Sequence, residues 1–176
     1  MIGINNIFIG ILLLFINFDV HFGNMTVGTV PNFLGFYFIL KGLSELAELS
    51  ERFDSMKIFA KAMIFYAMVI YGLNLLGIFG ALGILSYALT AIAMGIQLFI
   101  YYNIVMGIRD IELASQTRLG ARRLHALVIY MSIFYIMGFA FFFYELALFG
   151  LIAGFVTNFT FLYAFYRTKK EYYAAS

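Results

Sequence analysis

The sequence contains no cysteine and no tryptophan, and Pro31 is its single proline. Without cysteine, the chain has no disulfide, no thiolate metal site and no thiol redox chemistry. Any aromatic belt at a membrane interface has to be built from the 13 tyrosines, because tryptophan is missing. A single proline leaves most helices without proline kinks.

Charged residues are also scarce. They make up 11% of the 176 residues, whereas hydrophobic residues make up 64% and the mean hydropathy is +0.97. A soluble domain carries about 25% charged residues, and no water-facing surface can be built from so few. We therefore expect lipid to surround most of the chain. The first apolar run lacks a basic segment before it and a small-x-small cleavage site after it, so we interpret it as a retained span.

The eleven Lys and Arg residues form three clusters separated by apolar stretches. Each stretch is long enough to cross a bilayer and return, since one crossing takes about 20 helical residues. If each stretch is a helical hairpin, the outer turns carry no Lys or Arg, and the positive-inside rule places both termini in the cytoplasm. The clusters are Lys41, Arg52, Lys57 and Lys61; Arg109, Arg118, Arg122 and Arg123; and Arg167, Lys169 and Lys170.

This charge pattern predicts an all-α, polytopic membrane bundle, with six transmembrane helices arranged as three hairpins in one domain over residues 1–176. The alternative is a re-entrant second segment, which leaves five full spans. The predicted location is the cytoplasmic (inner) membrane of a bacterial cell. The six expected spans are about 4–20, 28–47, 58–77, 81–108, 125–144 and 147–167.

Two links between these spans can be placed from sequence. Residues 62–108 hold no charged side chain and contain two spans, with a turn near Gly77, Gly80 and Gly83, where glycines weaken helix continuity. After the second span, Glu48 and Arg52 lie four residues apart, which favours a helix that continues into the cytoplasm.

The first candidate site lies in the outer turns. The cluster consists of Asn17 at the outer end of the first span, Asp19 and His21 in the turn that follows it, and Glu145 in another outer turn. Acidic groups and imidazole near a membrane surface can bind a cation or relay protons. The alternative is a solvated turn whose polar residues face water.

The second candidate site consists of uncharged polar residues inside the spans. Gln97 and Asn158 fall near mid-depth and are placed to line a polar cavity. The alternative is a structural role, because an amide in lipid forms interhelical hydrogen bonds worth about 1 kcal/mol.

The sequence shows no motif for catalysis. It contains no Gly-x-Ser-x-Gly, His-Glu-x-x-His, P-loop or dinucleotide-binding pattern. We therefore expect no catalytic residue, no metal site and no cofactor, and no nucleic acid as a partner.

The segment from Val27 to Leu43 resembles one that is common in an uncharacterised family of small bacterial multi-pass integral membrane proteins. In that family a Pro, an Asp or Asn, an aromatic residue and a Gly open the second span, and a Gly-Leu pair closes it. The resemblance implies a bacterial membrane location and brings no activity. The matching positions are Pro31, Asn32, Phe33, Gly35, Gly42 and Leu43.

The overall plan also resembles the substrate-binding subunits of energy-coupling-factor vitamin transporters, which have six spans and a ligand pocket near the outer face. This architectural resemblance implies binding or transport of a small-molecule solute, or a role as the membrane subunit of a transport complex. That is the function we expect first, and a membrane-embedded enzyme acting on lipid is the least favoured.

The alternative function is a non-catalytic accessory protein that acts through helix–helix contacts with a larger membrane protein or as a homo-oligomer. Ala88, Ala91 and Gly95 recur at helical spacing along the fourth span. Small residues let helices approach closely, so we expect this stripe either to pack inside the bundle or to contact a partner.

Overall fold

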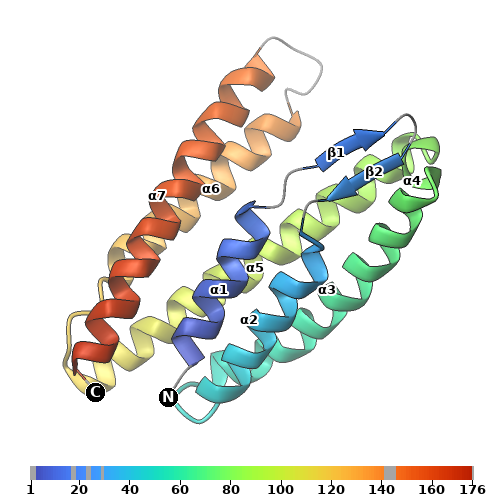
Figure 1. Cartoon of the computed structure of the whole chain (residues 1–176). Coiled ribbons are helices and arrows are strands. Elements are labelled where there is room, and N and C mark those ends of the chain that lie inside the picture. Colours follow the sequence, from blue (N-terminus) through green and yellow to red (C-terminus); the bar gives the residue numbers. More distant parts are fainter. Residues whose placement is uncertain (1–2, 17–18, 23–24, 29, 141–145, 176) are drawn as a thin grey trace. The chain divides into compact units, whose positions relative to one another are not determined.

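The computed structural model describes residues 3–16, 19–22, 25–28, 30–140 and 146–175. Within these ranges the fold is helical, with seven helices and one short β hairpin (Figure 1). The helical fold class predicted from sequence is thus confirmed. The helices are α1 (Gly3–Ile16), α2 (Asn32–Leu46), α3 (Glu51–Leu75), α4 (Ile78–Ala81), α5 (Ile84–Ser115), α6 (Ala121–Ala140) and α7 (Leu146–Ala175), and the strands are β1 (Asp19–Phe22) and β2 (Met25–Gly28).

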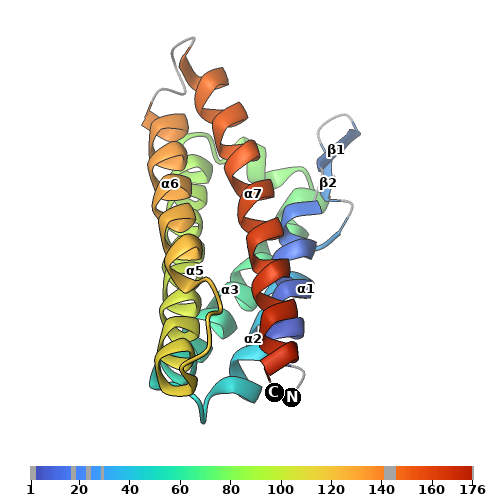
Figure 2. The same ribbon diagram turned by 90° about the vertical axis from the view of Figure 1, so that its left-hand side faces the viewer.

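The chain divides into two compact units, Met1–Ile100 and Tyr101–Ser176. In the first unit α2 packs against both α1 and α3. In the second unit α6 and α7 lie side by side as a hairpin (Figure 2). The aromatic ring of Phe161 on α7 stacks on the ring of Tyr101 on α5, with the ring centroids 5.8 Å apart, and so packs α7 against this end of α5.

The helices α1 and α2 meet through glycines that recur every seven residues, or about two helical turns. A Cβ atom added to Gly10 would lie 2.5 Å from the carbonyl oxygen of Gly35, and one added to Gly42 would lie 2.5 Å from the carbonyl oxygen of Gly3. The two backbones are therefore in direct contact along one face. Close glycine contacts of this kind hold helices together where lipid supplies no hydrophobic drive.

A break between α2 and α3 shows that the predicted continuous helix through Glu48 and Arg52 is wrong. The first helix ends at Leu46 and the next begins at Glu51. Ser50 adopts an extended backbone with ψ 134°, and its side-chain oxygen accepts a hydrogen bond from the Arg52 backbone N–H at 3.3 Å. Serine in this role is a strong N-cap, so a new helix starts where the old one was expected to continue.

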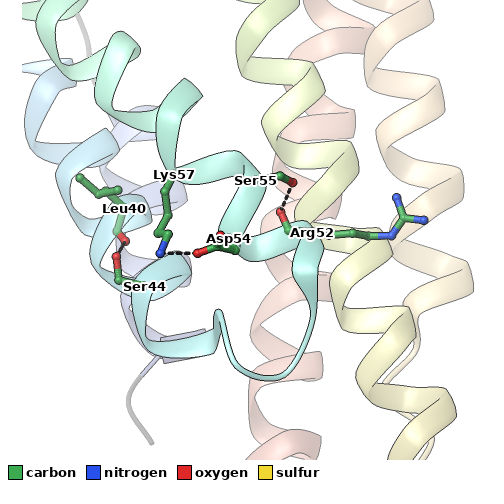
Figure 3. Close-up of polar contacts among 6 residues, drawn as sticks. All are labelled: Leu40, Ser44, Arg52, Asp54, Ser55 and Lys57. Atoms are coloured by element: carbon green, nitrogen blue, oxygen red, sulfur yellow. Dashed lines mark hydrogen bonds and ion pairs between the residues drawn. The ribbon is translucent and has the colours of Figure 1, made fainter.

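The first turn of α3 favours this start electrostatically. Asp54 lies in that turn, where a negative charge interacts well with the helix dipole. Figure 3 shows its ion pair with Lys57 and the hydroxyl of Ser55 donating to the Arg52 carbonyl. It also shows the Ser44 hydroxyl donating to the Leu40 carbonyl on α2.

The ends of the first two helices also differ from the expected spans 4–20 and 28–47. The helix α1 ends at Ile16, and the antiparallel strands β1 and β2 occupy part of the intervening segment, with Asp19 opposite Gly28 and Phe22 opposite Met25. Valine and threonine in these strands have high β propensity, which the sequence analysis did not weigh.

The glycine turn between α3 and α5 is confirmed. Gly77 and Gly83 adopt left-handed backbones, with φ of 68° and 55°, on either side of the four-residue helix α4. A residue with a Cβ is strained in this region, so glycine fits both places where the chain reverses.

Among the described residues, two helices, α3 and α5, are long and apolar enough to cross a membrane by length and composition. Only 17% of the most apolar 18-residue window of α3 is buried, and only 11% of that of α5. These apolar faces are thus exposed, unlike the core helix of a soluble protein, and soluble monomers rarely expose large apolar patches. The six-span topology stays a prediction.

Candidate functional site

The predicted outer cluster falls largely where the structure gives no side-chain detail. Asn17 and Glu145 lie outside the described residues. Asp19 and His21 belong to β1, where their backbones pair with Gly28 and Thr26 of β2. Their convergence into one site therefore stays a prediction.

The two predicted mid-span residues lie in different units. Gln97 is half-buried on α5 in the first unit, and Asn158 is half-buried on α7 in the second. The Asn158 amide donates one hydrogen bond to the Tyr135 hydroxyl on α6 and another to the Gly154 carbonyl at 3.1 Å. Asn158 thus joins α6 to α7, which favours the structural alternative for this residue.

A polar contact that the sequence analysis missed joins the glycine-lined helices of the first unit. The Asn6 side chain is 4% exposed, and its amide donates a hydrogen bond to the Glu45 carboxylate over 2.8 Å. Asn6 lies between Gly3 and Gly10 on α1. The contact satisfies a buried amide, as buried polar groups require.

The second unit contains a pocket of about 240 Å³ where the α5–α6 link meets the end of α7. None of the four predicted site residues that the structure describes lines it. Three of its eight lining residues are arginines and one is a glutamate, so its formal charge is positive. The lining consists of Arg118, Leu119, Gly120, Arg123, Ala164, Arg167, Thr168 and Glu171.

A hydrogen bond joins α7 to the α5–α6 link on the buried side of this basic pocket. Thr168 on α7 is 2% exposed, and its hydroxyl donates a hydrogen bond to the Leu119 carbonyl over 2.7 Å. Gly120 follows with φ of 74°, and a Cβ there would lie 3.8 Å from the Thr168 oxygen. The left-handed backbone, more than lack of space, therefore favours glycine at this position.

A second hydrogen bond joins α5 to the start of α6. The Glu112 carboxylate on α5 accepts a hydrogen bond from the Ala121 backbone N–H over 2.9 Å. It occupies one of the free donors that every helix N-terminus exposes. A ligand in the pocket would therefore meet the arginine side chains rather than this backbone N–H.

The arginines stand at the exposed rim of the pocket. Arg167 forms an ion pair with Glu171 one turn later, with 3.0 Å between Nε and Oε1 and with 63% and 36% of the two side chains exposed. Exposed pairs of this spacing contribute about 0.3–0.5 kcal/mol. Among the described residues, no ion pair is recorded for Arg118 or Arg123.

This arrangement suits an anion. Guanidinium groups stay charged and donate from a planar fork that matches carboxylate and phosphate oxygens. Within the described ranges, no group of three or more His, Cys, Asp or Glu residues is placed to hold a metal ion.

No protein-family model matches the chain. Neither a curated protein nor a solved structure matches it. The geometry of the chain itself therefore carries the functional argument.

The sequence contained a partial signal for the basic pocket. Arg118 and Arg123 belong to the second cation cluster and Arg167 to the third, and both clusters were predicted to lie on one side of the membrane. The structure brings these three residues to one cavity. The cations of these two clusters were not predicted to line one cavity, so the pocket was missed.

Proposed function

We propose that the chain is a small, non-catalytic multi-pass protein of the cytoplasmic membrane that binds or transports a small anionic solute, alone or as the membrane subunit of a transport complex. The proposed topology has six spans and both termini in the cytoplasm. The observation that carries the binding function is the cavity with three arginines around it.

The membrane part of the proposal rests on exposed apolar surface. Ile58 on α3 and Ile84 on α5 are 70% and 88% exposed. Lipid is the solvent that accommodates such faces. The resemblance of Val27–Leu43 to a family of small bacterial membrane proteins agrees with this location and remains part of the proposal.

The pocket would face the cytoplasm in this topology. Its residues come from the α5–α6 link and the inner end of α7, and both carry cation clusters. Positive residues concentrate in cytoplasmic links. A bound solute would therefore be held at the inner face, whereas the architectural analogy with vitamin transporters suggested the outer face.

A panel of small anions tests the binding function. The full chain, purified in an uncharged detergent, would be unfolded by heat in acetate, sulfate or phosphate at constant ionic strength. An anion at 100 times its Kd stabilises by about 2.7 kcal/mol, which for a chain of this size raises the Tm by about 5–10 °C. We expect at least one anion to do so, and we expect Arg123→Gln to reduce the effect. A Tm that no anion changes would contradict the proposal.

A second function is favoured by a separate observation. Ala88 and Gly95 on α5 are exposed, and a Cβ added to Gly95 would meet nothing within 4 Å. Within the described residues of the first unit, no atom therefore covers the small-residue stripe of Ala88, Ala91 and Gly95 at Gly95. An accessory role through contact with another membrane helix agrees with this exposure.

A further inference from the structure

We propose that the basic pocket binds a phosphate group, either free or carried by a lipid headgroup, and that Arg167 exchanges Glu171 for it. This inference rests on the proposed anion binding and names the chemical class of the anion. Arg118, Arg123 and Arg167 are the residues that would contact it.

The number of arginines favours phosphate over carboxylate. A carboxylate has two oxygens, which one guanidinium fork can satisfy in a bidentate pair. Three arginines line this single pocket, so three forks are available to one ligand. A phosphate monoester offers three terminal oxygens and can engage several forks together.

The charge balance leads to the same ligand. Three arginines and Glu171 give the pocket lining a formal charge of +2. A phosphate monoester carries about −1.5 to −2 at neutral pH, so it would neutralise the lining, whereas a monocarboxylate would leave it positive.

The size of the pocket limits the ligand. Its volume is about 240 Å³, below the roughly 300–1,000 Å³ of sites that hold drug-sized molecules. The pocket therefore suits a single headgroup or a small phosphate compound. It lies at the inner end of α7, where lipid headgroups would also lie in the proposed topology.

Arg167 is available for the exchange. Its side chain is 63% exposed, and among the described residues its ion pair is with Glu171. Such an exposed pair contributes little, so a dianion that competes for the same guanidinium can replace the carboxylate. Removing Glu171 should then strengthen phosphate binding, and removing Arg167 should weaken it.

The experiment measures binding by the full chain in two settings. In an uncharged detergent the probe is inorganic phosphate, titrated at constant ionic strength. In nanodiscs of phosphatidylcholine the probe is phosphatidic acid, added as a minor component. The variants are Arg123→Gln, Arg167→Gln and Glu171→Gln. Arg122→Gln is the matched control, because it removes one exposed cation beside the pocket that is not part of its lining.

We expect Arg123→Gln and Arg167→Gln each to weaken binding by about tenfold, which corresponds to about 1.4 kcal/mol. Glu171→Gln should strengthen binding, and Arg122→Gln should change the Kd little. Binding of inorganic phosphate in detergent identifies a soluble ligand, and binding of phosphatidic acid alone identifies a lipid headgroup; both support the proposal.

Three results would overturn it. If Arg122→Gln weakens binding as much as Arg123→Gln, general surface charge attracts the anion and the pocket does not. If neither phosphate source binds while acetate or sulfate stabilises the protein, the ligand is not phosphate, although anion binding stands. If no anion binds at all, both this inference and the proposed function fail.

Discussion

Adding a single methyl group to the contact between α1 and α2 should destabilise the first unit. In Gly10→Ala the new Cβ would lie 2.5 Å from the Gly35 carbonyl oxygen and 2.8 Å from the Ile39 backbone nitrogen. In Gly42→Ala it would lie 2.5 Å from the Gly3 carbonyl oxygen. Because these neighbours are backbone atoms, no side-chain rotation can relieve the clash, and the helices have to move apart.

The size of the effect follows from the geometry. Ordinary contact begins at 3.4 Å, so a neighbour at 2.5 Å has to retreat by about 0.9 Å. Overpacking of this kind costs about 1–3 kcal/mol. The greater helix propensity of alanine offsets part of this cost, by about 0.8–1.0 kcal/mol. The net loss for each variant should therefore be about 0–2 kcal/mol.

Gly95→Ala is the matched control. It makes the same chemical change in a helix, but its Cβ would meet nothing within 4 Å. The difference between Gly10→Ala and Gly95→Ala should therefore report the overpacking energy alone, about 1–3 kcal/mol.

The assay is reversible unfolding of the detergent-solubilised protein, followed by circular dichroism. The two contact points of α1, at Gly3 and Gly10, lie about 10 Å apart along the helix. Both variants nevertheless force the same pair of helices apart, so the double variant should lose less stability than the sum of the two single losses. If both single variants are as stable as Gly95→Ala, the close contact between the two backbones is not present and the reasoning is refuted.

Three further predictions follow from the topology and the candidate sites. Single cysteines, introduced into a chain that has none, should react with an impermeant thiol reagent from outside at Gly80 but not at Ser50 or Ser115; outside labelling at Ser115 would reverse the orientation. Gly95→Leu should leave the unfolding transition unchanged and should reduce the oligomer size or the binding of a partner, measured by crosslinking. If crosslinking shows the same assembly in the variant, the accessory role loses its main support. Asp19→Asn should weaken cation binding at the outer face, measured by calorimetry, without reducing expression. If the variant binds cations as well as the original protein, the solvated turn is favoured.

The sequence predicted the helical class and the glycine turn because both depend on local chemistry. Uncharged apolar runs form helices in lipid, and Gly77 and Gly83 have the left-handed backbones that a turn between helices uses. The N-cap at Ser50 was also a local signal, a serine followed by acidic residues. It was missed because the spacing of Glu48 and Arg52 was given more weight.

The close helix contacts and the pocket depend on tertiary structure. The glycines of each helix, α1 and α2, are seven residues apart, and only the packing of the two helices against each other brings them into contact. The basic pocket needs Arg118 and Arg167 together, and these lie far apart in the chain. Only the fold of the second unit brings them to one cavity.

The glycine contact also has a consequence for how related sequences should vary. Substitution at Gly10 or Gly42 meets a backbone oxygen, which no change at the partner position can remove. Gly35, by contrast, faces the Leu14 side chain first, at 2.6 Å, and Gly3 faces Leu46 at the same distance. A smaller residue at either leucine would remove that shortest contact, and the carbonyl oxygens of Gly10 and Gly42 would then lie 3.0 and 3.2 Å from the new Cβ atoms, farther away than in the first two cases. Homologues should therefore keep glycine at positions 10 and 42 without exception, whereas positions 3 and 35 should change together with 46 and 14.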